Sequence, residues 1–151
     1  MLTAAPKNWF SWNFRLQEPT GTGVGEVRIS WKEHGSIILR SGIYRIHRRG
    51  LLGPFTMESP DGAIVGSAGK PSALRREFVV GDDQRSYVLK AVSPFRRECG
   101  VFRDERRIAS IVPESWFRRS ARVQFTEDMP LLFQAFFVWL TLLMWKRFDG
   151  A

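Results

Sequence analysis

The segment that most constrains the fold is the apolar run 131–145, which reads LLFQAFFVWLTLLMW. It contains no charged residue, its only polar side chains are Gln134 and Thr141, and Lys146 and Arg147 follow it directly. A helix that is apolar on every side must be buried, either inside a protein or in a membrane. The surroundings of this segment therefore decide what kind of molecule the chain forms.

As a membrane span, this segment would be short. Residues 129–145 would form about 25 Å of helix at ~1.5 Å per residue, whereas a hydrocarbon core is about 30 Å thick. Trp139 lies near the middle of the segment, although membrane helices favour Trp at the interfaces. Gln134 and Thr141 share one helical face, which suits a helix with a protein partner. We expect a buried helix at about 129–147, and a tail-anchored membrane protein that uses the same residues stays an alternative.

The residues around this segment favour a helix with defined ends. Asp128 can cap its N-terminus, Pro130 suits the first turn, and Glu127 places negative charge at the positive end of the helix dipole. Lys146 and Arg147 complement the opposite end of the dipole. These signals predict a helix in lipid and in protein alike.

The rest of the chain reads as short strands separated by turns. Phe14 and Leu16 alternate with Arg15 and Gln17, which is the period of a strand with one buried face. Similar alternation, broken at Val88, recurs in the segments 27–32, 44–47, 55–58, 86–90 and 121–126. Turn-forming residues between such runs give about eleven or twelve strands at regular spacing, which is typical of a sandwich or a barrel.

The strands and the helix satisfy each other's need for burial. Strands with one apolar face need a core, and closed barrels of about eleven strands can hold a central helix. We therefore predict one mainly β (α+β) domain spanning 1–151, a closed antiparallel barrel of about twelve strands around a buried hydrophobic C-terminal helix. The helix residues predicted to fill the barrel are Phe133, Phe136, Phe137, Trp139, Leu140 and Leu143.

Several loosely spaced motifs resemble the tubby-like superfamily, in its LURP-one-related and phospholipid-scramblase-like branch. They are GIYRI at 42–46, GLLGPF at 50–55, Asp61-Gly62, AGK at 68–70, and the ending PLLFQAF at 130–136 with Trp139. The resemblance covers about residues 9–147. It implies a twelve-stranded barrel threaded by the C-terminal helix, in a family that includes phosphoinositide binders and scramblase-like membrane proteins. No ligand residue of that family can be matched to a position of this chain.

The charge of the chain indicates an anionic partner. The chain has 23 Lys and Arg against 15 Asp and Glu, for a formal net charge of +8. Basic residues attract acidic membranes at about 1 kcal/mol each, and they attract nucleic acid phosphates equally. Trp12 belongs to the buried face of its strand, which makes base stacking and hence nucleic acid the weaker hypothesis. A solvated outer face also explains the charge. The candidate anion-binding residues are Arg45, Arg48, Arg49, Arg75, Arg76, Arg96 and Arg97.

Residues that would carry catalysis are sparse. His34 and His47 have no carboxylate or thiol at ligand spacing, so we predict no metal site and no cofactor. The single cysteine, Cys99, excludes an internal disulfide and suits a reducing, cytoplasmic compartment. We predict a non-enzymatic binding module for anionic phospholipid headgroups or a membrane surface, peripheral at that membrane. The tail-anchored protein and a nucleic-acid or protein-binding module stay open as alternatives.

Overall fold

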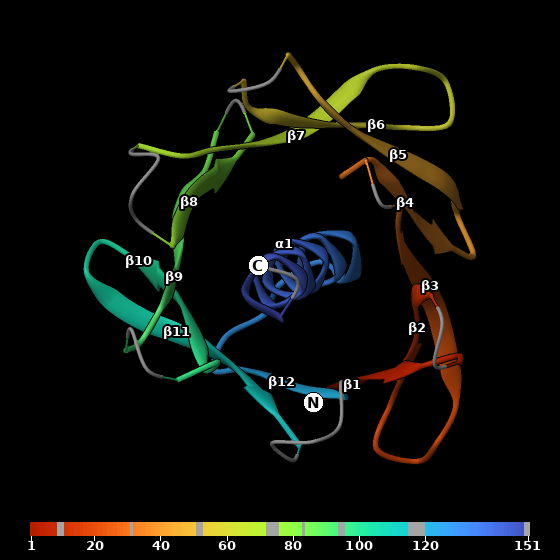
Figure 1. Ribbon diagram of the computed structural model, residues 1–151, viewed down its shortest axis with the longest axis vertical. Coiled ribbons are helices and arrows are strands. Elements are labelled where there is room, and N and C mark those ends of the chain that lie inside the picture. Colours follow the sequence, from red (N-terminus) through yellow and green to blue (C-terminus); the bar gives the residue numbers. More distant parts are fainter. Residues whose placement is uncertain are drawn as a thin grey trace.

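The chain folds into a closed antiparallel β-barrel with a helix inside it (Figure 1). The computed structural model describes residues 1–8, 11–30, 32–50, 53–71, 76–82, 84–93, 96–114 and 120–149, with helix side chains as far as residue 147. These residues contain twelve strands and one helix. The predicted fold class is confirmed.

The strands follow one another around the barrel in chain order, and the ring closes between the first and the last. Leu2 of the first strand lies opposite Val123 of the last, in antiparallel register. Closure leaves no unpaired edge among the described strands, and free edges are where sheets tend to aggregate. The strands are β1 (Leu2–Pro6), β2 (Trp12–Gln17), β3 (Gly23–Ile29), β4 (Gly35–Leu39), β5 (Gly42–Arg48), β6 (Phe55–Glu58), β7 (Ile64–Gly69), β8 (Glu77–Gly81), β9 (Ser86–Ala91), β10 (Cys99–Arg103), β11 (Arg106–Pro113) and β12 (Ala121–Phe125).

Alternate residues of each strand face the interior. In β2, Phe14 and Leu16 are fully buried while Arg15 between them is exposed. In β9, Val88 is an apolar residue at a position where the alternation predicts a polar one. It faces the outside of the barrel, where it pairs with the exposed Val79 of β8. The break therefore marks an apolar pair on the outside of the barrel and leaves the register unchanged.

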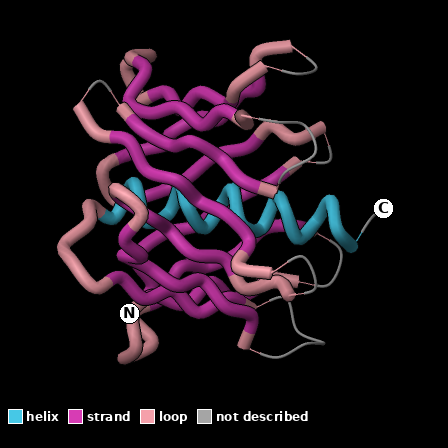
Figure 2. The backbone as a smooth tube through the Cα atoms, turned by 90° about the vertical axis from the view of Figure 1, so that its left-hand side faces the viewer, coloured by secondary structure: helices cyan, strands magenta, loops and turns pink. Residues whose placement is uncertain are grey.

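The helix α1 (Leu131–Asp149) runs along the barrel axis (Figure 2). Of the helix residues predicted to fill the barrel, Phe133 is partly buried and the others have no exposed surface. The apolar segment is thus covered by strands. Among the described residues no helix has the length and apolarity needed to cross a membrane, and the transmembrane alternative for 129–147 gains no support.

The helix starts slightly later than the residue pattern indicates. Its first backbone bond runs from Gln134 N to Pro130 O at 3.0 Å. The residue whose carbonyl accepts this first bond occupies the capping position, so Pro130 stands where we expected Asp128. Gln134 Nε2 donates to Met129 O at 2.8 Å and satisfies a second carbonyl at this end.

Two tryptophans attach the helix to the barrel wall. Trp139 Nε1 donates to Arg28 O of β3, and Trp145 Nε1 donates to Arg97 O, each at 2.8 Å. By contrast, the Thr141 hydroxyl donates to Phe137 O within the helix. The two indole N–H groups therefore join the helix to the surrounding barrel.

Successive connections alternate between the two ends of the barrel (Figure 2), and these two ends carry different charge. We call the end where α1 finishes the basic end. Its described charged residues are Lys7, Lys32, Arg48, Arg49, Lys70, Arg76, Arg96, Arg97, Lys146 and Arg147, with Glu33, Glu77, Glu98, Glu114 and Asp149. At the acidic end, where α1 begins, they are Glu18, Glu58, Asp61, Asp82, Asp104, Glu105, Glu127 and Asp128, with Arg40, Arg85, Arg103 and Arg106.

Candidate functional site

Most of the arginines predicted as a site lie at the basic end. Arg48 is the last residue of β5, and Arg49 begins the connection after it. Arg45 is an exposed residue in the middle of β5, on the outer wall and apart from this group. Arg75 lies outside the described residues. The others at this end are Arg76, Arg96 and Arg97.

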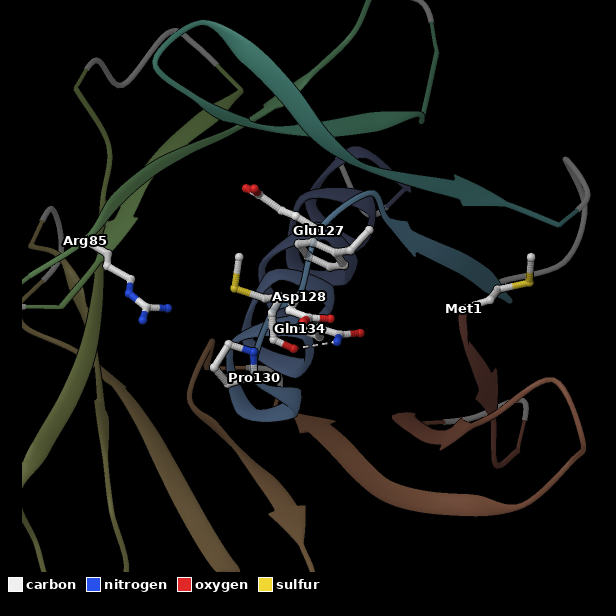
Figure 3. Close-up of a pocket in the computed structure, with 8 residues that line it drawn as sticks. Met1, Arg85, Glu127, Asp128, Pro130 and Gln134 are labelled. Atoms are coloured by element: carbon white, nitrogen blue, oxygen red, sulfur yellow. Dashed lines mark hydrogen bonds between the residues drawn. The ribbon is translucent and has the colours of Figure 1, made fainter.

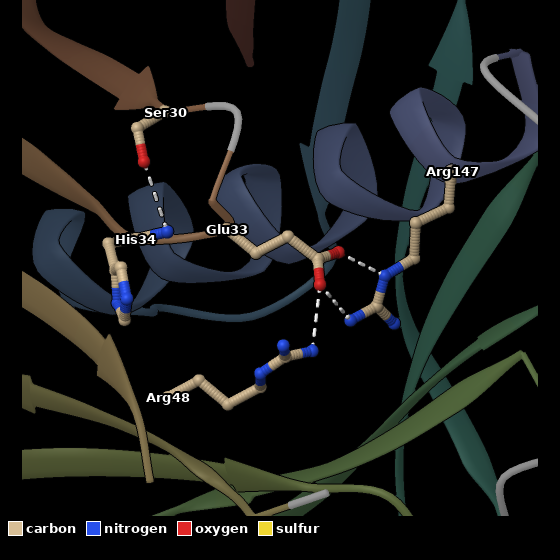
Figure 4. Close-up of polar contacts among 5 residues, drawn as sticks. All are labelled: Ser30, Glu33, His34, Arg48 and Arg147. Atoms are coloured by element: carbon tan, nitrogen blue, oxygen red, sulfur yellow. Dashed lines mark hydrogen bonds and ion pairs between the residues drawn. The ribbon is translucent and has the colours of Figure 1, made fainter. Parts of the chain in front are cut away.

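A carboxylate from the β3–β4 connection lies between two of the guanidinium groups at this end (Figure 4). Glu33 accepts hydrogen bonds from Arg147 Nε, from Arg147 Nη2 at 3.1 Å and from Arg48 Nη1 at 2.7 Å. Arg48 reaches this position because it follows the buried Ile46 by two residues, and so shares its inward side at the end of the strand. Glu33 thus links the β3–β4 connection to β5 and to α1.

The backbone presents Glu33 through a tight turn. Glu33 N donates to Ser30 O at 3.0 Å, and Ser30 N donates to His34 O at 2.7 Å. Glu33 has a φ of 63°, in the left-handed region that a non-glycine residue rarely adopts. A turn of this shape directs the carboxylate toward the end of the helix rather than along the outer wall.

The charges around Glu33 favour its ionised form. The hydrogen bond from Arg147 lowers its pKa, partial burial opposes this, and the positive charges of Arg147, Arg48 and Lys146 lower the pKa further. The side chains of Glu33, Arg48 and Arg147 are 19%, 22% and 33% exposed, so solvent still reaches them.

Lys70 adds a third cation to this group. Its ammonium lies 6.0 Å from the centroid of the Phe78 ring, at the mouth of the barrel. Although Lys70 is an exposed residue, partial desolvation lowers its pKa, the positive charge of Arg147 lowers it further, and Glu33 opposes both. We call Arg48, Lys70 and Arg147 the cation cluster.

Two backbone carbonyls of the β9–β10 connection accept hydrogen bonds from side chains at this end. The Arg97 carbonyl accepts the Trp145 indole N–H, and Arg76 Nη2 donates to the Arg96 carbonyl at 3.2 Å. Arg96 itself is exposed. The β9–β10 connection is thus tied to the helix while its guanidinium groups remain near the surface.

The acidic end carries an open hollow beside the start of α1 (Figure 3). Glu127, Asp128 and Gln134 line it, and Arg85 lies across from them. Glu127 Oε2 is already engaged by Arg103 Nη2 at 2.9 Å. This hollow brings together none of the residues predicted as a site.

The described residues offer no metal centre and no activated thiol. The rings of His34 and His47 lie 5.8 Å apart, yet no group of three His, Cys, Asp or Glu suited to a metal ion occurs within the described chain. Cys99 is fully buried, and this burial raises its pKa to about 12. A thiol in this state is a poor nucleophile.

Glu33, Lys70 and Arg147 were absent from the predicted site, although all three are visible in the sequence. The signal that finds them is the parity of the connections, since every second connection of an up-and-down barrel reaches the same end. The sequence indicated for Arg147 only a favourable interaction with the helix dipole.

No family model, curated protein or solved structure matches the chain.

Proposed function

We propose that this chain is a non-enzymatic binding module whose basic end docks on anionic lipid headgroups at a membrane surface. The observation that carries the proposal is the separation of charge between the two ends of the barrel. A membrane approached end-on would meet Arg49, Arg96 and Lys146, while the acidic residues of the opposite end would face away. Evenly distributed charge would give no such preferred orientation.

The resemblance to the tubby-like superfamily supports the same proposal. That family pairs a twelve-stranded barrel and a central helix with binders of phosphoinositides, and this chain has a barrel of that kind. We propose membership of the LURP-one-related and scramblase-like branch as the origin of the fold.

Vesicle binding tests the proposal. The full chain should bind phosphatidylcholine vesicles that contain phosphatidylserine and should ignore vesicles of phosphatidylcholine alone. Binding should fall steeply between low salt and physiological salt, where charges are screened over about 8 Å. Equal binding to both kinds of vesicle would contradict the proposal.

A matched pair of double variants locates the contact. Arg49→Gln with Arg96→Gln removes two exposed cations from the basic end, and Arg40→Gln with Arg85→Gln removes two from the acidic end. Both double variants have the same net charge, so a difference in their affinity for vesicles shows which end of the barrel makes the contact. We expect about tenfold or greater loss for the first pair, at about 1 kcal/mol per residue, and little for the second.

Nucleic acid is the second candidate, because phosphate backbones would be attracted by the same charges. Short single-stranded and double-stranded DNA and RNA should be titrated in the buffer used for the vesicles. If nucleic acid binds at physiological salt and acidic vesicles do not, the lipid proposal is wrong. If neither binds, the charge serves only to keep the barrel solvated.

A further inference from the structure

The cation cluster carries more positive charge than its built-in carboxylate neutralises. Arg48 and Arg147 both donate to Glu33, so one negative charge is shared between two guanidinium groups. Within the described part of the chain, Lys70 Nζ donates no hydrogen bond. Lys70 directly follows β7 at the end of the barrel where α1 finishes, and the positive charge of Arg147 contributes to lowering its pKa.

The three donors lie at the same end of the barrel, where α1 finishes. Arg48 ends β5, Lys70 directly follows β7, and Arg147 lies in the last turn of α1. Glu33 reaches them from a turn, and its left-handed backbone is strained. The two arginines therefore belong to elements of the barrel, whereas Lys70 and Glu33 lie in connections beside them.

We propose that Arg48, Lys70 and Arg147 form a site for a phosphate group, and that Glu33 is an internal counter-ion which the incoming phosphate displaces. A phosphate monoester carries about −1.5 to −2 charge at pH 7 and three acceptor oxygens. It matches three cations better than a carboxylate does, and arginine forks bind phosphate in a bidentate manner. The inference rests on the proposed function only in taking a lipid headgroup as the source of the phosphate.

The decisive comparison is between two glutamates that each bridge two cations, at different places in the barrel. Glu26 also bridges two cations, Lys7 at 2.6 Å and Arg28 at 2.8 Å, and its side chain is 19% exposed, as is that of Glu33. It lies on the outer wall, in β3. Glu33→Gln and Glu26→Gln therefore change the net charge equally, and only the first removes the internal competitor.

Pyrophosphate in solution and vesicles containing phosphatidic acid are the probes. Glu33→Gln should raise the affinity for both by about fivefold, the effect of one charge at the site. Glu26→Gln should leave both affinities nearly unchanged. Equal affinities for the two variants would overturn the inference.

A second pair keeps the inference testable if the loss of Glu33 disturbs the fold. Lys70 and Lys90 both lie over aromatic rings, at 6.0 Å from Phe78 and 4.6 Å from Phe102. Lys70→Gln should weaken pyrophosphate binding about fivefold at an unchanged melting temperature, and Lys90→Gln should not. If Lys70→Gln has no effect, the lysine is outside any phosphate site and the three-cation assignment is wrong.

The vesicle series separates this inference from the proposed function. Phosphatidic acid offers a phosphate monoester and phosphatidylserine does not, so the two vesicle types are compared at matched surface potential. If the wild-type chain binds both equally and Glu33→Gln changes nothing, docking is by diffuse charge and only this inference fails. If pyrophosphate binds with the expected variant effects but no vesicle does, the phosphate site stands with a soluble ligand, and the membrane proposal fails.

Discussion

At a single residue, Gly35, the barrel wall leaves room for the indole ring of Trp139 from the helix. A Cβ atom at this position would collide with Arg28 O and would lie 2.6 Å from Trp139 Nε1. The absent side chain is what allows Trp139 to donate its hydrogen bond to Arg28 O. Sequence reasoning placed Trp139 in the core but gave no reason to connect it with a glycine about a hundred residues earlier.

Gly35→Ala should therefore destabilise the protein. Forcing the wall away from the helix and weakening one hydrogen bond should lower the free energy of unfolding by about 2–4 kcal/mol. Gly23→Ala is the control, because Gly23 also begins a strand and a Cβ there meets nothing within 4 Å. Urea unfolding of both variants checks the prediction, and equal stability losses would refute it.

Glu33 should give the protein an acid-sensitive increment of stability. In the folded state its pKa lies below the ordinary value of 4.5, chiefly because of Arg147. Its ionised form thus stabilises the fold; that contribution is complete above 4.5 and is lost as pH falls through the folded-state pKa.

The stability difference between the wild type and Glu33→Gln should accordingly be largest near neutral pH and should shrink as the pH falls below 4.5 through the folded-state pKa. Thermal unfolding across this range measures it. In an Arg147→Gln background the difference should shrink, because the first partner of Glu33 is gone. A difference that stays constant with pH would mean that Glu33 acts through its shape rather than its charge.

Among the elements, the helix was the most predictable and the first strand the least. A run of fifteen residues without charge must be buried if it is helical, and the residues that flank it mark the ends of a helix. β1, with the sequence LTAAP, has little strand propensity of its own and gains its conformation from pairing with β2 and β12. That pairing is tertiary, and so no local pattern could reveal it.

Two phenylalanines of α1 should differ in their contribution to stability. Phe136 has no exposed surface, so Phe136→Ala should cost about 3–5 kcal/mol in the free energy of unfolding. Phe133, one turn earlier, is only partly buried, and Phe133→Ala should cost clearly less. Urea unfolding of both variants with unchanged slope tests this. A larger loss at Phe133 would show that the start of the helix is the better-packed end.

At the scale of the whole molecule, we expect the barrel and its helix to unfold as one cooperative unit. Deleting residues 129–151 would expose inward side chains such as Phe14, Phe78 and Leu89, all without exposed surface in the intact protein. We expect an aggregated chain or one without a cooperative unfolding transition. Size-exclusion chromatography and urea unfolding, run beside the full chain, are the measurements. A monomeric truncated chain that unfolds cooperatively would show that the helix is dispensable to the barrel.

The candidate site also emerges only at this scale. The sequence revealed an excess of arginine, but Glu33 and Arg147 are 114 residues apart, and no local pattern links them. Their meeting depends on the closed ring, which assigns every second connection to one end. The charge of the chain was therefore predictable, and its division between two ends was not.

The order of the elements has a consequence for biosynthesis. The ring closes only when β12 meets β1, and α1, which fills the interior, follows β12 in the chain. The strands β1–β12 are therefore synthesised before α1, the helix that they enclose. Until α1 is synthesised, the nascent strands have apolar faces with nothing to enclose, and such surfaces invite misassembly. Folding of this barrel can thus be completed only after α1 has been synthesised, and the interval before that is when the strands most need a chaperone.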